Sequence, residues 1–521
     1  MTNPLKGREQ WATRIGLILA MAGNAVGLGN FLRFPTQAAR NGGGAFMIPY
    51  FVSLLLLGIP LMWVEWSIGR YGGRHGQGTA PGIFQRLWRH PVAKYVGVLG
   101  VMLPLAIVIY YTYIESWTLA YSFFSVTQAF PDSATLEGMG NFLHSYQGIS
   151  TGAGPFPSIL TAYIFFLITI TLNVIILSRG IARGIELLAK IAMPILFIFA
   201  IILVIRIFTL DFATPPPPHS VSEGIGFIWN PDYSRLSDSS VWLAAAGQVF
   251  FTLSIGTGSI ITYASYLRAQ DDIALTALTT SMTNTFCEVI LGGSIAIPVA
   301  VAYFGLTQTQ GIAEEGSFNL AFQAMPIIFQ KLPAGTLFGS LWFLLLFFAG
   351  ITSSVALATP AMAFLQDELG MTRRKAAIGL GVLMFVCCQP IIFFLQYGFM
   401  DEFDFWTGTF GLVVFCFIEV LLFGWVFGMD KAWKELNLGA DIRIPKIFYY
   451  IIKYVTPLFL GTLLVTWFYQ DAWGILILRD VPEGYGLYRL GARALMAMLF
   501  IGLVFLVWKT WKGRKENHVD A

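Results

Sequence analysis

The sequence predicts an all-α integral membrane protein with twelve transmembrane helices, two of them broken near the middle. Of its 521 residues, 56% are hydrophobic and 12% are charged, whereas a soluble protein carries about 25% charged residues. Apolar runs long enough to cross a bilayer recur along the chain. They lie at residues 13–39, 44–69, 92–125, 158–178, 187–208, 240–267, 274–303, 336–365, 375–396, 405–427, 447–470 and 488–510.

The distribution of Lys and Arg predicts how these helices are oriented. The loop at 126–157 contains neither residue type, and the loops at 209–239 and 304–335 contain one such residue each. Lys and Arg are concentrated instead before the first span, in the loops after the second, eighth and tenth spans, and after the last span. Because positively charged loops stay in the cytoplasm, we expect both termini to be cytoplasmic.

Patterns typical of enzymes, metal centres and nucleic-acid binding are absent from the sequence. It has no catalytic-triad order, HExxH motif or Walker loop, and its five histidines lack metal-ligand spacing. The four cysteines lie within apolar runs, where we expect packing residues rather than a disulfide framework. We therefore expect a protein that is not an enzyme and has no nucleic-acid partner.

The stretch from Ala22 to Asn30 interrupts the first apolar run. Gly23, Gly27 and Gly29 weaken a helix there, because glycine loses the most backbone freedom on ordering. Irregular backbone at membrane depth persists only inside protein or beside a water-filled cavity. We therefore expect a broken helix whose exposed backbone groups bind a ligand. Packing of small residues is the alternative; a dinucleotide loop is excluded, because no strand-to-helix unit surrounds the glycines.

A second interruption lies in the sixth run, between Phe250 and Ser259. Gly256 and Gly258 would break the helix there, although packing of small residues is a fair alternative for both. Interrupted segments at matching places in two halves are the pattern of inverted-repeat transporters with a site at the membrane midplane.

Two adjacent hydroxyl groups, on Thr352 and Ser353, lie beside Ala349 in the eighth run. Hydroxyls in membrane helices usually bond back to a carbonyl one turn earlier or to a neighbouring helix, and we favour that interpretation for Ser354. The adjacent pair also suits a dehydrated sodium ion, a hard cation that prefers oxygen ligands.

Four glutamates lie within apolar runs, and Glu288 is the strongest functional candidate among them. It shares a helix face with Asn284, four residues earlier. Placing an ionisable group inside the membrane costs free energy, so such groups are interpreted as functional by default. Glu65, Glu115 and Glu419 lack such a neighbour, and we expect structural roles for them.

Together these motifs resemble the neurotransmitter:sodium symporter family, over nearly the whole chain. The resemblance implies two five-helix inverted repeats, at 13–208 and 240–427, followed by helices 11 and 12 at 447–510. Residues 1–12 would form a cytoplasmic gate segment and residues 511–521 a cytoplasmic tail. The motifs that carry the resemblance are Trp11 to Arg14, Gly23 to Pro35, Asn41 to Phe46, Tyr110-Tyr111, Phe251 to Ser254, and Thr352 to Ser354.

The resemblance implies an amino-acid site at the two breaks. The N–H groups of Leu28 and Gly29 and the Tyr111 hydroxyl would bind the carboxylate, because half-helix amino termini attract anions. The other implied contacts are the carbonyls of Ala25, Phe251 and Thr252, the Ser254 hydroxyl, and the side chains of Ile107, Thr257, Ser353 and Leu357.

The resemblance also implies two co-transported sodium ions. The first site would share the substrate carboxylate, which couples the ion to the substrate directly. Its protein ligands would be the Ala25 carbonyl, Asn30, Thr252 and Asn284. The second site would use the carbonyls of Gly23, Val26 and Ala349 and the hydroxyls of Thr352 and Ser353.

Two gates and a charge-balancing residue follow from the same resemblance. The outer gate would be Arg33 with Asp404, above a lid of Phe251 and Tyr111. The inner gate would be Arg8 with Asp367, and Trp11 would dock the amino terminus. Glu288 would provide the negative charge that chloride provides in chloride-dependent members, so we expect transport without chloride.

The side-chain pocket departs from that of a leucine-transporting member of the family. Thr257 stands in place of Phe, Ile107 in place of Val, and Leu357 in place of Ile. The net change predicts a larger pocket, while the backbone-binding and ion positions are unchanged. The alternative is that neighbouring side chains move in and refill the space.

We therefore expect a sodium-coupled symporter of neutral, mainly hydrophobic amino acids, aliphatic or aromatic, that works by alternating access in the plasma (inner) membrane of a prokaryote. Its partners would be the amino acid, sodium and the lipid bilayer; the oligomeric state is left open, a homodimer included. One alternative is another small zwitterion or an amine on the same fold, although no acidic side chain lies near Ala25 to bind an amine. The alternative from a different class is a channel-like or sensory membrane protein.

Overall fold

The computed structural model describes residues 11–149, 154–212, 216–316, 318–479 and 481–519, and every regular element within them is helical. Among these residues, an isolated bridge pairs Gly43 with Pro231. The helices are α1 (Arg14–Ala25), α2 (Phe34–Arg40), α3 (Gly44–Ser53), α4 (Ile59–Arg74), α5 (Ala80–Leu87), α6 (Ala93–Val96), α7 (Leu99–Thr127), α8 (Leu136–Tyr146), α9 (Leu160–Ser178), α10 (Glu186–Phe208), α11 (Val221–Trp229), α12 (Ser239–Leu253), α13 (Ser259–Ala264), α14 (Ile273–Thr285), α15 (Ala296–Phe304), α16 (Leu306–Glu315), α17 (Met325–Lys331), α18 (Gly335–Asp367), α19 (Arg373–Phe393), α20 (Phe399–Phe403), α21 (Gly411–Leu421), α22 (Met429–Leu436), α23 (Ile447–Tyr450), α24 (Thr456–Trp467), α25 (Trp473–Leu476) and α26 (Gly486–Val519).

Short π-helical turns join many of these helices into longer continuous segments. The turns that contain residues discussed below are η1 (Gly29–Arg33), η6 (Phe286–Gly292), η9 (Asp404–Phe410) and η10 (Leu422–Val426). Turns of this kind often mark functional sites in helices. Here η1 follows the first break directly and η6 contains Glu288.

The number of membrane-crossing segments agrees with the sequence prediction. Within the described ranges, ten helical segments are long and apolar enough to cross a bilayer, and the bent pair Arg14–Ala25 and Gly29–Arg40 makes an eleventh. The bend in that pair is 46°. The remaining expected span is formed by α12 and α13, each of which is too short to cross alone. The prediction of broken first and sixth spans is therefore confirmed; the repeat boundaries stay a prediction.

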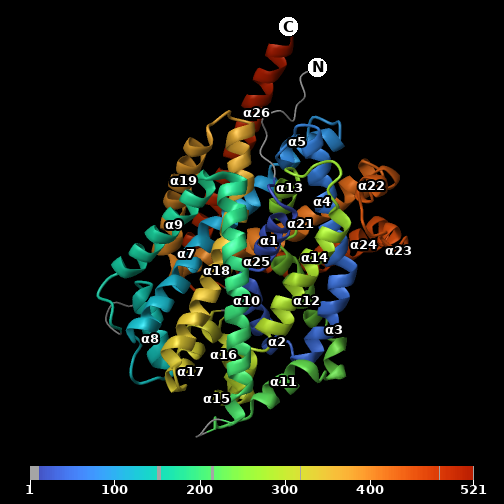
Figure 1. The fold of residues 1–521 in the computed structure, drawn as a ribbon. Helices are drawn as coiled ribbons and strands as arrows, with labels where there is room; N and C mark the ends of the chain where they lie inside the picture. The colour runs from blue at the N-terminus through green and yellow to red at the C-terminus, as the bar shows by residue number, and fades with distance from the viewer. Residues whose placement is uncertain (1–10, 150–153, 213–215, 317, 480, 520–521) are drawn as a thin grey trace.

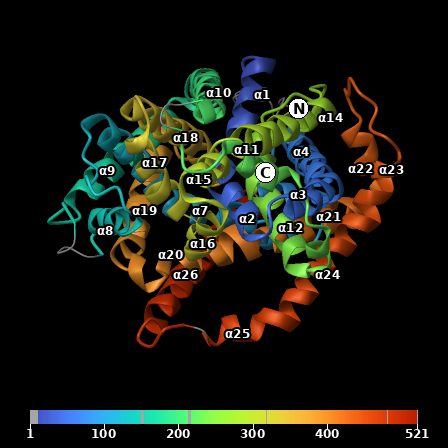
Figure 2. The same ribbon diagram turned by 90° about the horizontal axis from the view of Figure 1, so that it is seen from below.

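The broken spans lie in the middle of the bundle, and the last two spans lie at its edge. Figure 1 shows α10 and α18 running side by side along the long dimension of the molecule, and Figure 2 shows α25 at the rim. The most apolar part of the span containing α7 is 94% buried, whereas that of α26 is 17% buried. The apolar surface of α26 is therefore left to contact lipid.

The first break arises where the backbone leaves the helix after Ala25. Val26 has φ −77° and ψ 94°, an extended conformation. None of Gly23, Gly27 and Gly29 has a positive φ. They supply room instead: a Cβ on Gly27 would lie 2.6 Å from the Ser353 hydroxyl. The sequence located this break correctly, but close approach of neighbouring spans explains its glycines better than backbone freedom does.

The second break depends on left-handed backbone. Gly256 and Gly258 have φ of 76° and 78°, and Ser254 has φ 55°. Such values are uncommon for residues other than glycine. The Ser254 hydroxyl donates to the Asn24 carbonyl at 2.9 Å, which ties the strained position to the first break.

Close packing of α4 against α13 leads to a stability prediction. A Cβ on Gly69 would lie 2.3 Å from the Ile261 carbonyl oxygen and 2.7 Å from the Ala264 Cβ. We expect Gly69→Ala to lower the free energy of unfolding by about 1–3 kcal/mol, because overpacking forces the backbone to shift. The measurement is the thermal unfolding midpoint of the full chain in detergent.

Gly379→Ala is the matched control, since Gly379 lies in α19 and its nearest neighbour to an added Cβ is the Met371 methyl group at 3.8 Å. That substitution should stabilise the helix by about 0.5–1 kcal/mol. Equal midpoints for the two variants would contradict the packing argument.

Candidate functional site

Four helix ends meet at the centre of the bundle. The carboxyl-terminal ends of α1 and α12 bring backbone carbonyls that lie outside the regular helical hydrogen-bond pattern, and the turns that begin η1 and α13 bring N–H groups of the same kind. Helix carboxyl termini carry partial negative charge and amino termini carry partial positive charge. The arrangement therefore suits a ligand that carries both signs of charge, together with cations.

Asn284, on α14, is the centre of a buried cluster of polar groups. Its side-chain amide lies 2.8 Å from the Asn30 amide, 3.0 Å from the Thr252 hydroxyl and 3.0 Å from the Ala25 carbonyl oxygen. Asn30 Oδ1 also accepts a hydrogen bond from the Gly27 N–H at 2.8 Å. The four protein residues predicted for the first sodium site thus come together from both broken spans and α14.

A second cluster joins α1 to α18. The Ser353 hydroxyl donates to the carbonyls of Gly23 at 3.1 Å and of Asn24 at 3.4 Å. Thr352 donates back to the Ala349 carbonyl at 3.1 Å, and a Cβ on Gly23 would lie 3.0 Å from the Thr352 Cβ. Gly23, Ala349, Thr352 and Ser353, together with Val26 at the break itself, are the residues predicted for the second sodium site; the contact with Asn24 was not predicted.

The adjacent hydroxyl has the structural role that we favoured for it. Ser354 donates to the Asn173 side chain at 2.8 Å and to the Ile351 carbonyl at 3.2 Å. Asn173 in turn donates to both carboxylate oxygens of Glu115 at 3.4 Å. Glu115 is therefore held in a separate buried network that joins α7, α9 and α18.

A narrow cavity touches both clusters. Its volume is about 30 Å³, room for about two water molecules. An amino acid therefore requires its walls to move apart. Residues predicted for substrate binding that line the cavity are Ala25, Gly29, Ile107, Tyr111, Phe251, Thr252, Ser254, Thr257, Ser353 and Leu357. Leu28, also predicted, lines a second cavity above it.

Tyr111 and Leu28 are already joined. The Leu28 N–H donates to the Tyr111 hydroxyl oxygen at 3.0 Å. Because this hydroxyl accepts a bond here, its own hydrogen can be donated to another acceptor. A carboxylate at this position would therefore meet the phenolic donor, and it could accept the Leu28 N–H in exchange for the bond that this group makes to Tyr111.

The Thr257 hydroxyl is fully occupied by its own segment. It donates to the Ser254 carbonyl at 2.7 Å, accepts from the Ser259 N–H at 3.2 Å and contacts the Ser259 hydroxyl at 2.6 Å. The Ser259 hydroxyl in turn reaches the Asn24 side-chain oxygen at 3.3 Å. Thr257 consequently has no free hydrogen-bonding capacity to offer the cavity.

The second cavity lies on the other side of Phe251 and Tyr111, which line both cavities. It has a volume of about 120 Å³, and both Arg33 and Asp404 line it. The Arg33 guanidinium stacks over the Phe251 ring, 4.5 Å from its centroid, and Asp404 accepts from the Tyr110 hydroxyl at 2.7 Å. In the described residues Arg33 and Asp404 form no ion pair, so their pairing as an outer gate stays a prediction.

At the inner end, Trp11 packs against α13. Its indole N–H donates to the Tyr263 carbonyl at 3.2 Å, and the two rings meet edge to face with centroids 5.3 Å apart. Arg8, the predicted partner of Asp367, lies outside the described residues. The docking of the amino terminus through Trp11 thus has a defined contact, whereas the inner ion pair is a prediction.

Glu288 lies one helical turn beyond Asn284 and is fully buried. Its carboxylate accepts from the Tyr50 hydroxyl and from the Gln248 amide, the latter at 2.5 Å. Gln248 lies one turn before Thr252 on α12. The Gln248–Glu288 contact therefore lies one helical turn from the Thr252–Asn284 contact, between the same two segments. This places the Glu288 carboxylate beside the first cluster.

Glu65, for which we expected a structural role, supports the second break. Its carboxylate accepts the Gly256 N–H at 2.5 Å, and its other oxygen is buried without a partner among the described groups. A glutamate in an apolar run signals a buried polar contact, but no sequence pattern identifies a partner 191 residues away.

Comparisons with known proteins agree with this geometry. The profile of the Sodium:neurotransmitter symporter family matches residues 8–145 and 141–506. An uncharacterized sodium-dependent transporter of Methanocaldococcus jannaschii is 32% identical, covering 97% of this chain and 99% of that protein. A sodium- and chloride-dependent betaine transporter of Caenorhabditis elegans is 26% identical, covering 86% and 79%. The crystal structure of MhsT in complex with L-phenylalanine matches with a TM-score of 0.76 and 30% identity, covering 88% of this chain and 99% of MhsT.

The chain belongs to the sodium:neurotransmitter symporter family. It is therefore a multi-pass membrane protein that carries out sodium-coupled symport, and it is a transporter rather than an enzyme.

Proposed function

We propose that this symporter carries a neutral, mainly hydrophobic amino acid together with two sodium ions, by alternating access and without chloride. The observation that carries the proposal is the meeting of helix ends of both polarities around one cavity that touches both polar clusters. MhsT, a structural neighbour, was solved in complex with L-phenylalanine, which supports an amino acid as the substrate class.

The carboxylate of the substrate is bound by the N–H groups of Leu28 and Gly29 and by the Tyr111 hydroxyl. Its ammonium group takes the carbonyls at the carboxyl-terminal ends of α1 and α12, those of Ala25, Phe251 and Thr252, and the Ser254 hydroxyl. Helix polarity favours this orientation over the reverse, because each end of the substrate meets the opposite partial charge.

One sodium ion binds in the cluster around Asn284, and the substrate carboxylate completes its ligands. The other binds between Val26 and the Thr352–Ser353 hydroxyls. Each set consists of carbonyl, amide and hydroxyl oxygens, which suit a hard monovalent cation. Sodium thereby replaces hydrogen bonds that the clusters make among themselves in the structure.

Glu288 balances the charge of the first ion. Residues one turn apart on a helix lie roughly 6 Å apart. At an effective dielectric constant of about 20, a unit negative charge at that distance stabilises a cation by about 3 kcal/mol. A fixed carboxylate of this kind takes the place of a bound chloride ion.

The experiment that tests the proposal is uptake of radiolabelled amino acids into proteoliposomes under an inward sodium gradient. Uphill, sodium-dependent accumulation of phenylalanine or leucine is expected. Accumulation of betaine or an amine in preference to every amino acid would favour another substrate class on the same fold. Downhill flux that ignores the sodium gradient would indicate a channel and contradict symport.

Replacing Glu288 by Ser should create chloride dependence. Wild-type uptake should be unchanged when gluconate replaces chloride, because the balancing charge is covalent. Uptake by Glu288→Ser should fall at least tenfold in gluconate and recover in chloride. Glu115→Ser, which removes a buried glutamate from a different network, should not become chloride-dependent. Collapse of wild-type uptake in gluconate would refute the assignment.

Removing Asp404 should impair transport more than substrate binding. Within the described residues Asp404 forms no ion pair with Arg33 and instead accepts from Tyr110, so Asp404→Ala should change the equilibrium dissociation constant less than about fivefold, which is about 1 kcal/mol. Uptake should fall at least tenfold, because the gate controls which states are populated. Asp401→Ala, on the same cavity, is the control. Equal losses of binding and uptake would mean that Asp404 holds the substrate or the fold.

Thr257 should favour bulky substrates. Its hydroxyl is occupied, so it presents only apolar surface to the cavity, with far less volume than a phenylalanine. Each methylene of better fit contributes about 0.8 kcal/mol. In competition binding with sodium, Phe, Tyr, Trp or Met should bind at least as well as Leu and better than Ala or Gly.

Thr257→Phe should shift that preference towards Leu and away from Trp. Thr257→Val is the matched control, because it removes the hydroxyl contacts with Ser254 and Ser259 without adding a ring. An unchanged rank order in Thr257→Phe, or an equal shift in Thr257→Val, would show that volume at this position does not set substrate size.

A further inference from the structure

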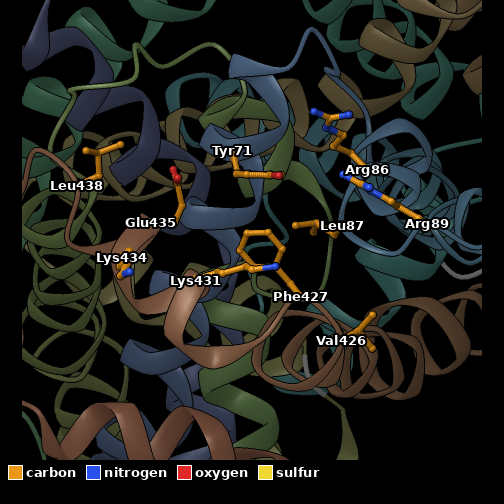
Figure 3. A pocket seen from close by; sticks show the side chains of 10 residues that line it. All are labelled: Tyr71, Arg86, Leu87, Arg89, Val426, Phe427, Lys431, Lys434, Glu435 and Leu438. Atoms are coloured by element: carbon orange, nitrogen blue, oxygen red, sulfur yellow. The ribbon is translucent and has the colours of Figure 1, made fainter.

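A basic pocket lies away from the transport site, between α5 and α22. Figure 3 shows Arg86 and Arg89 on one side, Lys431 and Lys434 on the opposite side, and Tyr71 with Phe427 between them. The pocket has a volume of about 690 Å³. We call these residues the basic pocket; its other lining residues are Leu87, Val426, Glu435 and Leu438.

The four cations of the basic pocket have no protein partner in the described part of the chain. All four are exposed, and none of them makes a hydrogen bond, ion pair or ring contact there. Glu435 does not neutralise them, because its carboxylate is already bound by Arg70 at 3.1 Å and Arg74 at 2.7 Å. The pocket therefore presents an uncompensated positive charge to whatever fills it.

The pocket lies where two membrane spans end. The span from Gly44 ends at Arg74, and the span from Phe399 ends at Val426. Beside Val426, the side chain of Trp425 is 55% exposed and donates to the Lys453 carbonyl. Exposed tryptophan next to lysine at the end of a span is typical of the membrane–water interface. The cations are thus at the depth of lipid headgroups.

One wall of the pocket is apolar and continues towards the membrane. Tyr71 and Phe427 stack edge to face with centroids 4.9 Å apart, and the Val426 side chain is 49% exposed. A small soluble anion would leave this apolar wall uncovered, whereas the glycerol and upper acyl chain of a lipid would cover it.

We propose that the basic pocket binds the phosphate of an anionic phospholipid, with the acyl chains running past Val426. Arginine suits two-pronged contact with phosphate oxygens and lysine acts as a point charge. In Figure 1, α5 and α22 lie towards the same end of the molecule as the carboxyl-terminal part of α26. We expect that end to be cytoplasmic, where anionic lipids attract clustered Lys and Arg.

The test is native mass spectrometry of the full chain in neutral detergent with added palmitoyl-oleoyl phosphatidylglycerol or phosphatidylcholine. Wild type should retain phosphatidylglycerol in preference to phosphatidylcholine. Lys431→Gln/Lys434→Gln should weaken phosphatidylglycerol binding at least tenfold. Arg86→Gln/Arg89→Gln, on the opposite wall, should do the same.

The matched control is Arg374→Gln/Lys375→Gln, which removes two exposed positive charges from the start of α19 and should leave binding unchanged. Equal weakening in the control would mean diffuse surface attraction and overturn the proposal. So would equal retention of phosphatidylcholine, or displacement of the lipid by glycerol phosphate at the same concentration, which would indicate a site for free anions.

Discussion

Backbone groups cannot be left unpaired inside a membrane, and the rest of this structure depends on that constraint. Breaking two helices at mid-depth exposes carbonyls and N–H groups that a continuous helix would pair internally. In this protein, side chains from other spans pair several of them. Tyr111 accepts the Leu28 N–H, Glu65 accepts the Gly256 N–H, and Ser254 donates to the Asn24 carbonyl. The breaks are thus stable without a ligand and still able to bind one.

Much of the architecture could be predicted because composition and hydropathy act locally. The apolar runs predicted the positions of the membrane spans, and the glycine clusters predicted the positions of both breaks. The physical reason for the first break was different from the expected one: Gly27 is small so that Ser353 and Tyr111 can approach, whereas Gly256 does adopt a left-handed backbone. A single sequence cannot distinguish these uses of glycine, because both appear as the same residue.

The candidate site could be predicted only as far as the resemblance supplied its members. The structure brings the predicted residues of each cluster together, but their roles as ligands are proposals. Contacts formed between distant spans were not predictable, such as Ser259 with Asn24, 235 residues apart, or Glu65 with Gly256. Nothing in the local sequence indicated that the Thr257 hydroxyl would be used up by its own segment.

The Asn24 carbonyl fastens three spans at one atom. The hydroxyl of Ser254, the residue that follows α12, and the hydroxyl of Ser353, in α18, both donate to it. Those two hydroxyls also belong to the sets proposed to hold the ammonium group and the second sodium ion. A bound substrate or ion would therefore replace internal hydrogen bonds rather than bind to free groups. Its free energy of binding would be the small difference between two similar interactions. A transporter built in this way binds its substrate with only modest affinity, and that modest affinity allows it to release the substrate.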